Sequence, residues 1–174
     1  MNSLMKRVSI FVDVQNIYYT TKQGFGSNFD YNAFWKQVTG GRQLVAAIAY
    51  AIDRGDEKQK QFQRILRAIG FEVRLKPFIQ RRDGSTKGDW DVGITLDIME
   101  YAKKSDVVVL ASGDGDFDLL LYKVRQDHGV LAEVYGVRKL TAKSLIDSSS
   151  KFIAIDEKLL LWVTLTIGYK FNGC

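Results

Sequence analysis

Residues 107–121 constrain the fold more than any other stretch, because they join a fully apolar run to a turn rich in glycine and aspartate. Residues 107–111 have no polar face, which is typical of a strand covered on both sides in a parallel sheet. Gly113 and Gly115 suit a tight exit from such a strand, and residues 117–121 predict the start of a helix. The turn therefore lies at the carboxyl end of a central strand, where open α/β sheets keep their binding sites.

Three acids occupy this turn: Asp114, Asp116 and Asp118. A single aspartate before a helix is a good N-cap, so capping beside a solvated loop is the simplest interpretation of one of them. Three like charges within one turn instead raise each other's pKa or require a cation. A calcium loop of the helix-loop-helix type does not fit, because Leu119 and Arg125 stand where that loop needs glycine and glutamate.

A second apolar run, residues 7–14, also ends on a carboxylate. Asp13 closes this predicted strand, and Asn16 follows three residues later. A helix that begins near Val14 places Asn16 in its first turn, at the same edge of the sheet as Asp13. Asp13 alone could be an N-cap, but its position repeats the pattern of the first strand.

A third group of acids opens the predicted helix in residues 87–99. Asp89 is the expected N-cap, and Asp91 then lies in the first turn without an evident structural role. The apolar residues expected to pack this helix on the sheet are Val92, Leu96 and Met99, with Ile94 and Ile98 nearby.

The alternation of apolar strands and amphipathic helices predicts an α/β protein. We expect a three-layer α/β/α arrangement around a central, mainly parallel sheet of five to six strands. The chain of 174 residues suits one compact domain over residues 1–156. Residues 157–174 are expected to pack as an extension on this domain or on a partner. Residues 20–29, with their glycines, are expected to form a loop.

The net charge of +5 favours a polyanionic partner. Basic residues concentrate between positions 74 and 87, on a predicted half-exposed edge strand (residues 71–76) and in a predicted exposed loop (residues 80–86). Arg81, Arg82 and Lys87 are the expected contacts to a nucleic-acid backbone, although a solvated basic loop has the same composition.

Cysteine usage and the start of the chain bear on its location. A single cysteine, Cys174, excludes an intramolecular disulfide and suits a reducing compartment. The chain opens with a short polar stretch before its first strand and has no long apolar segment, so we expect a soluble, cytoplasmic protein without a membrane partner.

The predicted topology gathers four carboxylates at one sheet edge: Asp13, Asp91, Asp114 and Asp116. Four such charges within a few ångströms need a divalent counter-ion, and oxygen-only ligands favour Mg²⁺ or Mn²⁺. Two such ions would activate a water and stabilise the leaving oxygen in a phosphoryl displacement. The residues therefore point to hydrolysis of a phosphodiester.

Three motifs in this order resemble the NYN domain family, in particular its LabA-like (DUF88) branch. They are FVDVQN, KGDWDVGITLDIM and VVVLASGDGDFDLLL, and the likeness spans about residues 7 to 156. The resemblance implies a PIN-like nuclease fold and metal-dependent cleavage of RNA. The family's motif positions fall on Asp13, Asn16, Asp91, Asp114 and Asp116. Asp89 and Asp118 depart from the family pattern and are alternative ligands.

We therefore predict an endoribonuclease with four metal-binding aspartates, while Asn16 orients a ligand or a phosphate. The four are Asp13, Asp91, Asp114 and Asp116. Single-stranded RNA is the favoured substrate, and a homo-oligomer is compatible with the sequence but not indicated by it. One alternative is a non-catalytic RNA- or protein-binding regulatory module that keeps the acidic pocket. Another is a phosphatase for small phosphoesters, against which the basic segment argues.

Overall fold

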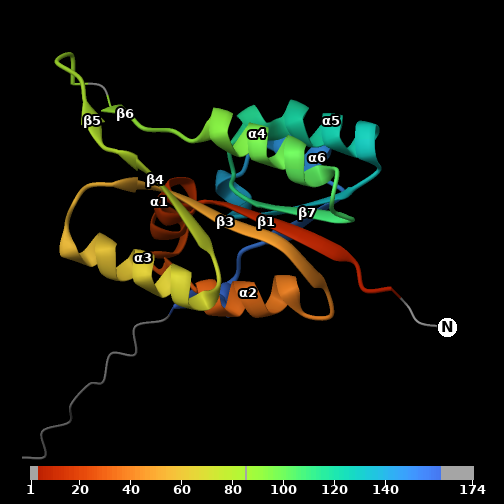
Figure 1. Cartoon of the computed structure of the whole chain (residues 1–174). Helices are drawn as coiled ribbons and strands as arrows, with labels where there is room; N and C mark the ends of the chain where they lie inside the picture. Colours follow the sequence, from red (N-terminus) through yellow and green to blue (C-terminus); the bar gives the residue numbers. More distant parts are fainter. Residues whose placement is uncertain (1–3, 85, 162–174) are drawn as a thin grey trace, which may run out of the picture.

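The computed structural model describes residues 4–84 and 86–161, apart from the side chains of Thr86 and Lys87. These residues form three layers, with a central sheet between two groups of helices (Figure 1). The predicted α/β class is confirmed.

The central sheet has six parallel strands in the order β4-β3-β1-β7-β8-β9. The strands are β1 (Arg7–Asp13), β3 (Gln43–Asp53), β4 (Glu72–Pro77), β7 (Val107–Ala111), β8 (Leu131–Gly136) and β9 (Lys151–Ala154). The chain builds the sheet outwards from β1 to β4 and then starts again at β7, on the other side of β1. The direction of strand order thus reverses between β1 and β7, which is the position where open α/β sheets bind ligands.

One group of helices covers each face of the sheet (Figure 1). On one face lie α1 (Val14–Phe25), α2 (Tyr31–Thr39) and α3 (Glu57–Ile69). On the other lie α4 (Asp91–Ala102), α5 (Asp118–His128) and α6 (Lys143–Ser148). Short 3₁₀ turns complete the connections: η1 (Gly115–Phe117), η2 (Arg138–Leu140) and η3 (Glu157–Leu159).

The two faces of β1 explain why helices are needed on both sides. Val8, Ile10 and Val12 are fully buried and pack with α1, α2 and α3. Phe11 is also fully buried but points to the opposite face, where it packs with α4 and α5. A strand that is apolar on both faces is stable only when each face is covered.

α1 extends further than the sequence predicted. The expectation of a loop over residues 20–29 holds only for residues 26 and 27, because α1 continues to Phe25, ends at Gly26 in a left-handed conformation, and is followed by the short strand β2 (Asn28–Phe29). The hydroxyl groups of Thr20 and Thr21 donate to the carbonyl oxygens of Asn16 and Ile17 at 2.8 and 2.7 Å. These bonds satisfy the threonine hydroxyls within the helix, so the polar run does not interrupt it.

The buried face of α4 also differs from the prediction. Val92, Leu96 and Met99 were expected on the sheet, but their side chains are 70%, 63% and 40% exposed. Ile94 and Ile98 are fully buried instead. This helix is apolar around most of its circumference, so hydrophobic periodicity alone does not identify the side that packs.

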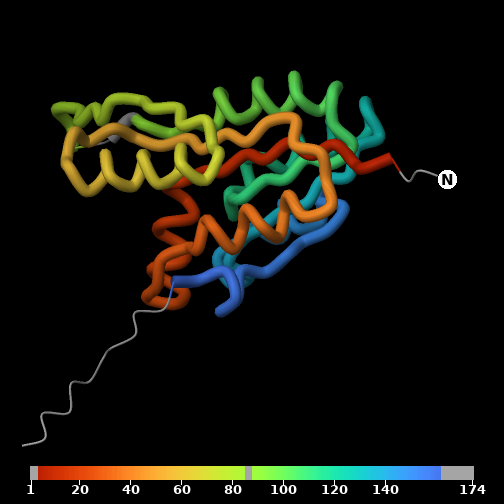
Figure 2. The backbone as a smooth tube through the Cα atoms, turned by 60° about the horizontal axis from the view of Figure 1, so that its bottom comes forward, coloured from red at the N-terminus to blue at the C-terminus, as the bar shows by residue number. Residues whose placement is uncertain are grey.

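The last described residues lie against the helices on the α1 face (Figure 2). β10 (Leu160–Leu161) pairs antiparallel with β2 (Asn28–Phe29), and Leu159 and Leu160 are buried. Of the predicted extension, residues 157–161 therefore pack on the domain, and residues 162–174 lie outside the described part of the chain. Within the described residues, no helix combines the length and apolar character needed to cross a membrane.

Candidate metal centre at the carboxyl edge of the sheet

Three acids meet beside the junction of β1 and β7. Asp91, Asp114 and Asp116 each offer a carboxylate oxygen, and these three oxygens lie within 4.8 Å of one another. Asp91 is the first residue of α4, whereas Asp114 and Asp116 belong to the turn after β7. The backbone N–H of Asp116 donates to Oδ1 of Asp114 at 2.9 Å, which fixes the two residues relative to each other. Segments distant in sequence thus supply one compact group of oxygens.

Asp13 connects to this group through a serine. The Ser112 hydroxyl donates to Oδ2 of Asp13 at 3.2 Å, and the Asp114 N–H donates to the same hydroxyl at 3.2 Å. Asp13 also caps α1, because its Oδ1 accepts from the Asn16 N–H at 3.4 Å. The carboxylate therefore ties the ends of β1 and β7 together. It is not one of the three mutually close oxygens.

Asn16 holds the same turn from the other side. Its side-chain oxygen accepts from the Gly113 N–H at 2.8 Å. A Cβ atom at Gly113 would lie 2.6 Å from the carbonyl oxygen of Leu140, so only glycine fits there without displacing the backbone. Sequence reasoning placed Gly113 in the tight turn but missed its hydrogen bond to Asn16 and the bridge that Ser112 forms between Asp13 and Asp114. Their signal was a serine and a glycine placed directly between a buried strand and the acids.

The start of α4 is fixed by Trp90. Its Nε1–H donates to the carbonyl oxygen of Ala51 at 2.9 Å, and the Lys76 ammonium lies 4.4 Å from the centre of its ring. Trp90, and not Asp89, is the N-cap residue of α4, so the predicted cap is wrong by one position. Asp89 instead accepts from the Asp91 N–H at 3.3 Å. The indole thus determines where Asp91 enters the site.

Among the described side chains, the acids of the site have no ion-pair partner. Burial raises the pKa of Asp13 to about 6, and it also raises the pKa of Asp91 to about 6, with the charges of Asp114, Asp89 and Asp13 adding to the effect. Among the side chains that the structure describes, the ion pairs involve other acids. An oxygen-only donor set with uncompensated negative charge fits Mg²⁺ or Mn²⁺.

Asp89 and Asp118, the two alternative ligands, are less well placed for a metal than Asp91, Asp114 and Asp116. Neither Asp89 nor Asp118 belongs to the group of three mutually close oxygens. Asp118 is the first residue of α5, and its Oδ1 accepts from the Leu119 N–H at 2.5 Å. Asp89 lies near enough for its charge to raise the pKa of Asp13 and Asp91.

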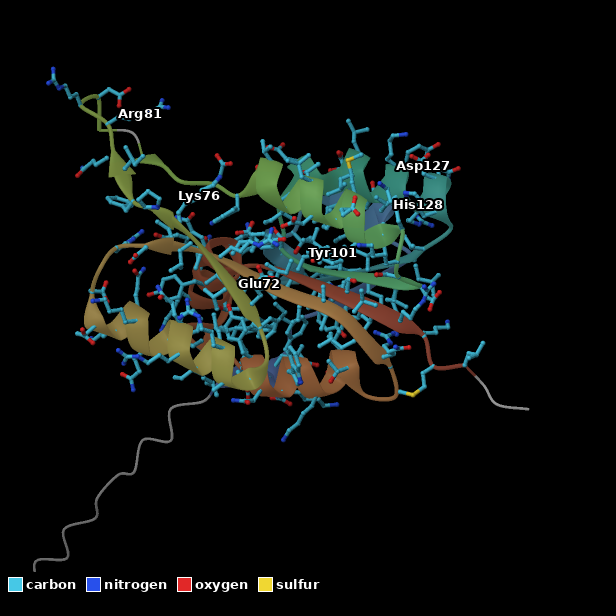
Figure 3. The ribbon with its side chains drawn as sticks, viewed as in Figure 1. Glu72, Lys76, Arg81, Tyr101, Asp127 and His128 are labelled. Carbon is cyan, nitrogen blue, oxygen red and sulfur yellow. The ribbon has the colours of Figure 1, made fainter. Side chains whose placement is uncertain are left out.

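The predicted basic contacts lie on a hairpin formed by β5 (Ile79–Gln80) and β6 (Thr86–Lys87). Arg81 and Arg82 are exposed, and Figure 3 shows Arg81 at the outer end of the hairpin, away from the sheet. Among the described side chains, no ion pair joins Arg81 or Arg82 to the acids of the site. The side chain of Lys87 lies outside the described part.

Comparison with known proteins places this arrangement in a family. The NYN domain model matches residues 7–156, which include every acid of the site. The chain belongs to the NYN domain family. This NYN domain is 26% identical over 161 residues to the low amplitude and bright protein LabA of Synechococcus elongatus, a match that covers 87% of this chain and 84% of LabA.

A solved structure shares both the fold and much of the sequence of this NYN domain. It is the crystal structure of VPA0982 from Vibrio parahaemolyticus, described as a protein of unknown function. The match has a TM-score of 0.88 at 53% identity and covers 92% of this chain and 99% of VPA0982.

Proposed function

We propose that this NYN domain is an endoribonuclease that hydrolyses RNA phosphodiester bonds with Mg²⁺ or Mn²⁺. The observation that carries the proposal is the group of three carboxylate oxygens from Asp91, Asp114 and Asp116 within 4.8 Å of one another, at the switch point of a parallel sheet. Membership of the NYN family supports the same chemistry.

In this proposal Asp91, Asp114 and Asp116 hold the divalent cation, with Asp13 as a further ligand. When bound, the cation supplies an activated water and stabilises the negative charge on the leaving oxygen. Asp13 also keeps the turn after β7 in place through Ser112. The side-chain oxygen of Asn16 accepts a hydrogen bond from the Gly113 N–H. The side-chain NH₂ group of Asn16 would then donate to a phosphate oxygen of the substrate.

The substrate class follows from charge. Arg81, Arg82 and Lys87 would neutralise phosphates of a long anion as it approaches the acidic edge. A small phosphoester would not reach both the hairpin and the acids. RNA therefore suits the molecule better than a phosphomonoester does.

The test is a cleavage assay with labelled single-stranded RNA and Mn²⁺, with and without a chelator. We expect cleavage that the chelator abolishes, and a loss of at least about 100-fold in Asp114→Asn, because metal ions supply several kcal/mol of transition-state stabilisation. The matched control is Asp127→Asn, which changes an exposed acid of α5 that pairs with Lys123. Its rate should equal that of the parent.

Two results would replace the proposal. RNA binding without any product, unaffected by the chelator, would indicate a binding module. Turnover of a chromogenic phosphomonoester without cleavage of RNA would indicate a phosphatase. Equal RNA cleavage by the parent and Asp114→Asn would remove the assigned site.

A further inference from the structure

The carboxyl edge of the sheet carries a second group of side chains beside the acids. β1, β3 and β4 are neighbours, and the segment that follows each of them carries a residue of a second cluster. This stacking cluster consists of Tyr19 in α1, Arg54 after β3 and Phe78 after β4. The cluster is next to the acidic site along the sheet edge, because β1, which borders β3, also carries Asp13 at its carboxyl end.

The arginine is held between the two rings. Its Nη2 donates to the Tyr19 hydroxyl at 3.5 Å, and its Cζ lies 5.0 Å from the centre of the Phe78 ring. The backbone around it is fixed as well, because the Arg54 N–H donates to Oε1 of Gln59 at 2.7 Å and the Phe78 N–H donates to the Asp53 carbonyl at 3.1 Å. The three side chains therefore lie together, on segments whose backbone is held by hydrogen bonds.

The cluster is open to solvent. Tyr19 is 50% exposed and Phe78 is 38% exposed, and Tyr18, edge-on to Tyr19 at 5.5 Å, is 51% exposed. Within the described side chains, the ion pairs do not include Arg54, so its charge remains for a ligand. Rings that only stabilise the core would be buried, as Phe34 and Phe117 are.

We propose that Tyr19, Arg54 and Phe78 form a platform on which bases of single-stranded RNA stack next to the cleavage site. Exposed aromatic rings and guanidinium planes stack on every base, whereas the bases of a duplex are already stacked and paired. Tyr19 follows Asp13 by six residues, or roughly 9 Å along a helix. β4 lies two strand spacings, about 10 Å, from β1. The platform would therefore hold nucleotides adjacent to the scissile phosphate.

This inference rests on the proposed function only in taking RNA as the ligand, so it is tested by binding without turnover. The full chain is titrated in EDTA against fluorescent single-stranded RNA of about 12 nucleotides, a length within the range of single-strand binding sites. An abasic strand of the same length and a duplex of the same sequence are titrated in parallel. Repulsion from the metal-free acids is the same for all platform variants and cancels in their comparison.

The variants are Tyr19→Ala and Phe78→Ala, with Tyr19→Phe to keep the ring. Tyr122→Ala is the matched control, because Tyr122 is 58% exposed but lies on α5, on the other face of the sheet. Each alanine variant should bind single-stranded RNA at least about fivefold more weakly. Tyr19→Phe and Tyr122→Ala should stay close to the parent, and no variant should change binding of the abasic strand.

Unchanged affinity in both alanine variants would overturn the platform, as would an equal loss for the abasic strand, which reports charge alone. A parent that binds neither strand, or that prefers the duplex, would overturn it as well. Alanine variants that bind and cleave RNA as the parent does would contradict the platform but support the proposed nuclease. Base-dependent binding by a protein that never cuts would leave the platform and remove the nuclease.

Discussion

The pKa values of the acids are shifted in opposite directions at the amino and carboxyl ends of β1 and β7. At the amino ends, Asp106 accepts from the Arg7 N–H at 2.7 Å and from its guanidinium at 3.0 and 3.2 Å. These hydrogen bonds lower the pKa of Asp106 to about 2. At the carboxyl ends, burial raises the pKa of Asp13 and Asp91 to about 6. The same pair of strands therefore pairs an acid with an arginine at one end and, among the described side chains, leaves acids without an ion-pair partner at the other, where we propose that a cation binds.

The largest expected difference between the two ends is in catalysis. Asp91→Asn should lower Mn²⁺-dependent RNA cleavage at least about 100-fold, because it removes a ligand of the proposed cation. Asp106→Asn should leave the rate within about twofold of the parent, since the described hydrogen bonds of the Asp106 side chain are to Arg7, at the opposite edge of the sheet. Rates measured under single-turnover conditions make the comparison. Equal losses in the two variants would show that the ends do not differ in function.

A second prediction changes the geometry of the acidic end without changing its charge. Gly113→Ala would place a Cβ 2.6 Å from the Leu140 carbonyl oxygen and displace the turn that carries Asp114. Overpacking of this kind costs about 1–3 kcal/mol of stability, and we expect Mn²⁺ affinity to fall about tenfold. Gly24→Ala in α1 is the control, because its Cβ would lie 2.9 Å from the Val137 side chain, away from the acids. It should lower stability but not Mn²⁺ affinity.

The pH dependence of stability sharpens the comparison further. An acid whose pKa is higher in the folded than in the unfolded protein binds more protons when folded, so the metal-free protein gains stability as the pH falls. For Asp13 and Asp91, the stability of the metal-free protein increases as the pH is lowered from about 6 to about 4. For Asp13, a rise of about two pKa units corresponds to at most about 3 kcal/mol.

Thermal unfolding in EDTA measures this gain. The melting temperature should rise as the pH is lowered from about 7 to about 5, and Asp13→Asn should flatten the curve. Mn²⁺ should raise the melting temperature more at about pH 7.5 than at about pH 5.5, because protons compete with the metal for the carboxylates. A metal-free parent that loses stability over this range would contradict the raised pKa values.

The smallest effect is expected at the amino ends. Asp106→Asn removes an ion pair whose side chains are 42% and 47% exposed, so the melting temperature near neutral pH should fall only slightly. Because the pKa of Asp106 is lowered, its contribution is present above about pH 4 and is lost as the pH falls towards 2. The effect of the substitution should therefore disappear in acid. A constant difference between variant and parent down to about pH 2 would argue against the pair.

The sequence predicted the layers and the acidic edge because both depend on local patterns. Runs without a polar face required a buried parallel sheet, and each acid stood directly after a strand or at the start of a helix. Parallel strands bring such ends to one edge whatever the order of the strands. Asp91, Asp114 and Asp116 could thus be named together from the sequence.

What the sequence did not predict depends on contacts between distant residues. Ile94 and Ile98 face the core of the protein, but Val92 and Leu96 are equally apolar, so the orientation of α4 follows from packing. The hydrogen bonds from the Gly113 N–H to Asn16 and from the Ser112 hydroxyl to Asp13 join segments almost 100 positions apart. The stacking cluster likewise joins a helix, α1, and the two segments that follow β3 and β4, and its residues show no common motif.

The central claim is that the acids at the carboxyl edge are held together for a divalent cation, and calorimetric titration with Mn²⁺ at about pH 7.5 tests it most directly. The account predicts binding by the parent, unchanged binding by Asp127→Asn, and at least about tenfold weaker binding by Asp91→Asn and Asp114→Asn. A parent that binds no Mn²⁺, or Asp91→Asn and Asp114→Asn variants that bind it as tightly as the parent, would contradict the account.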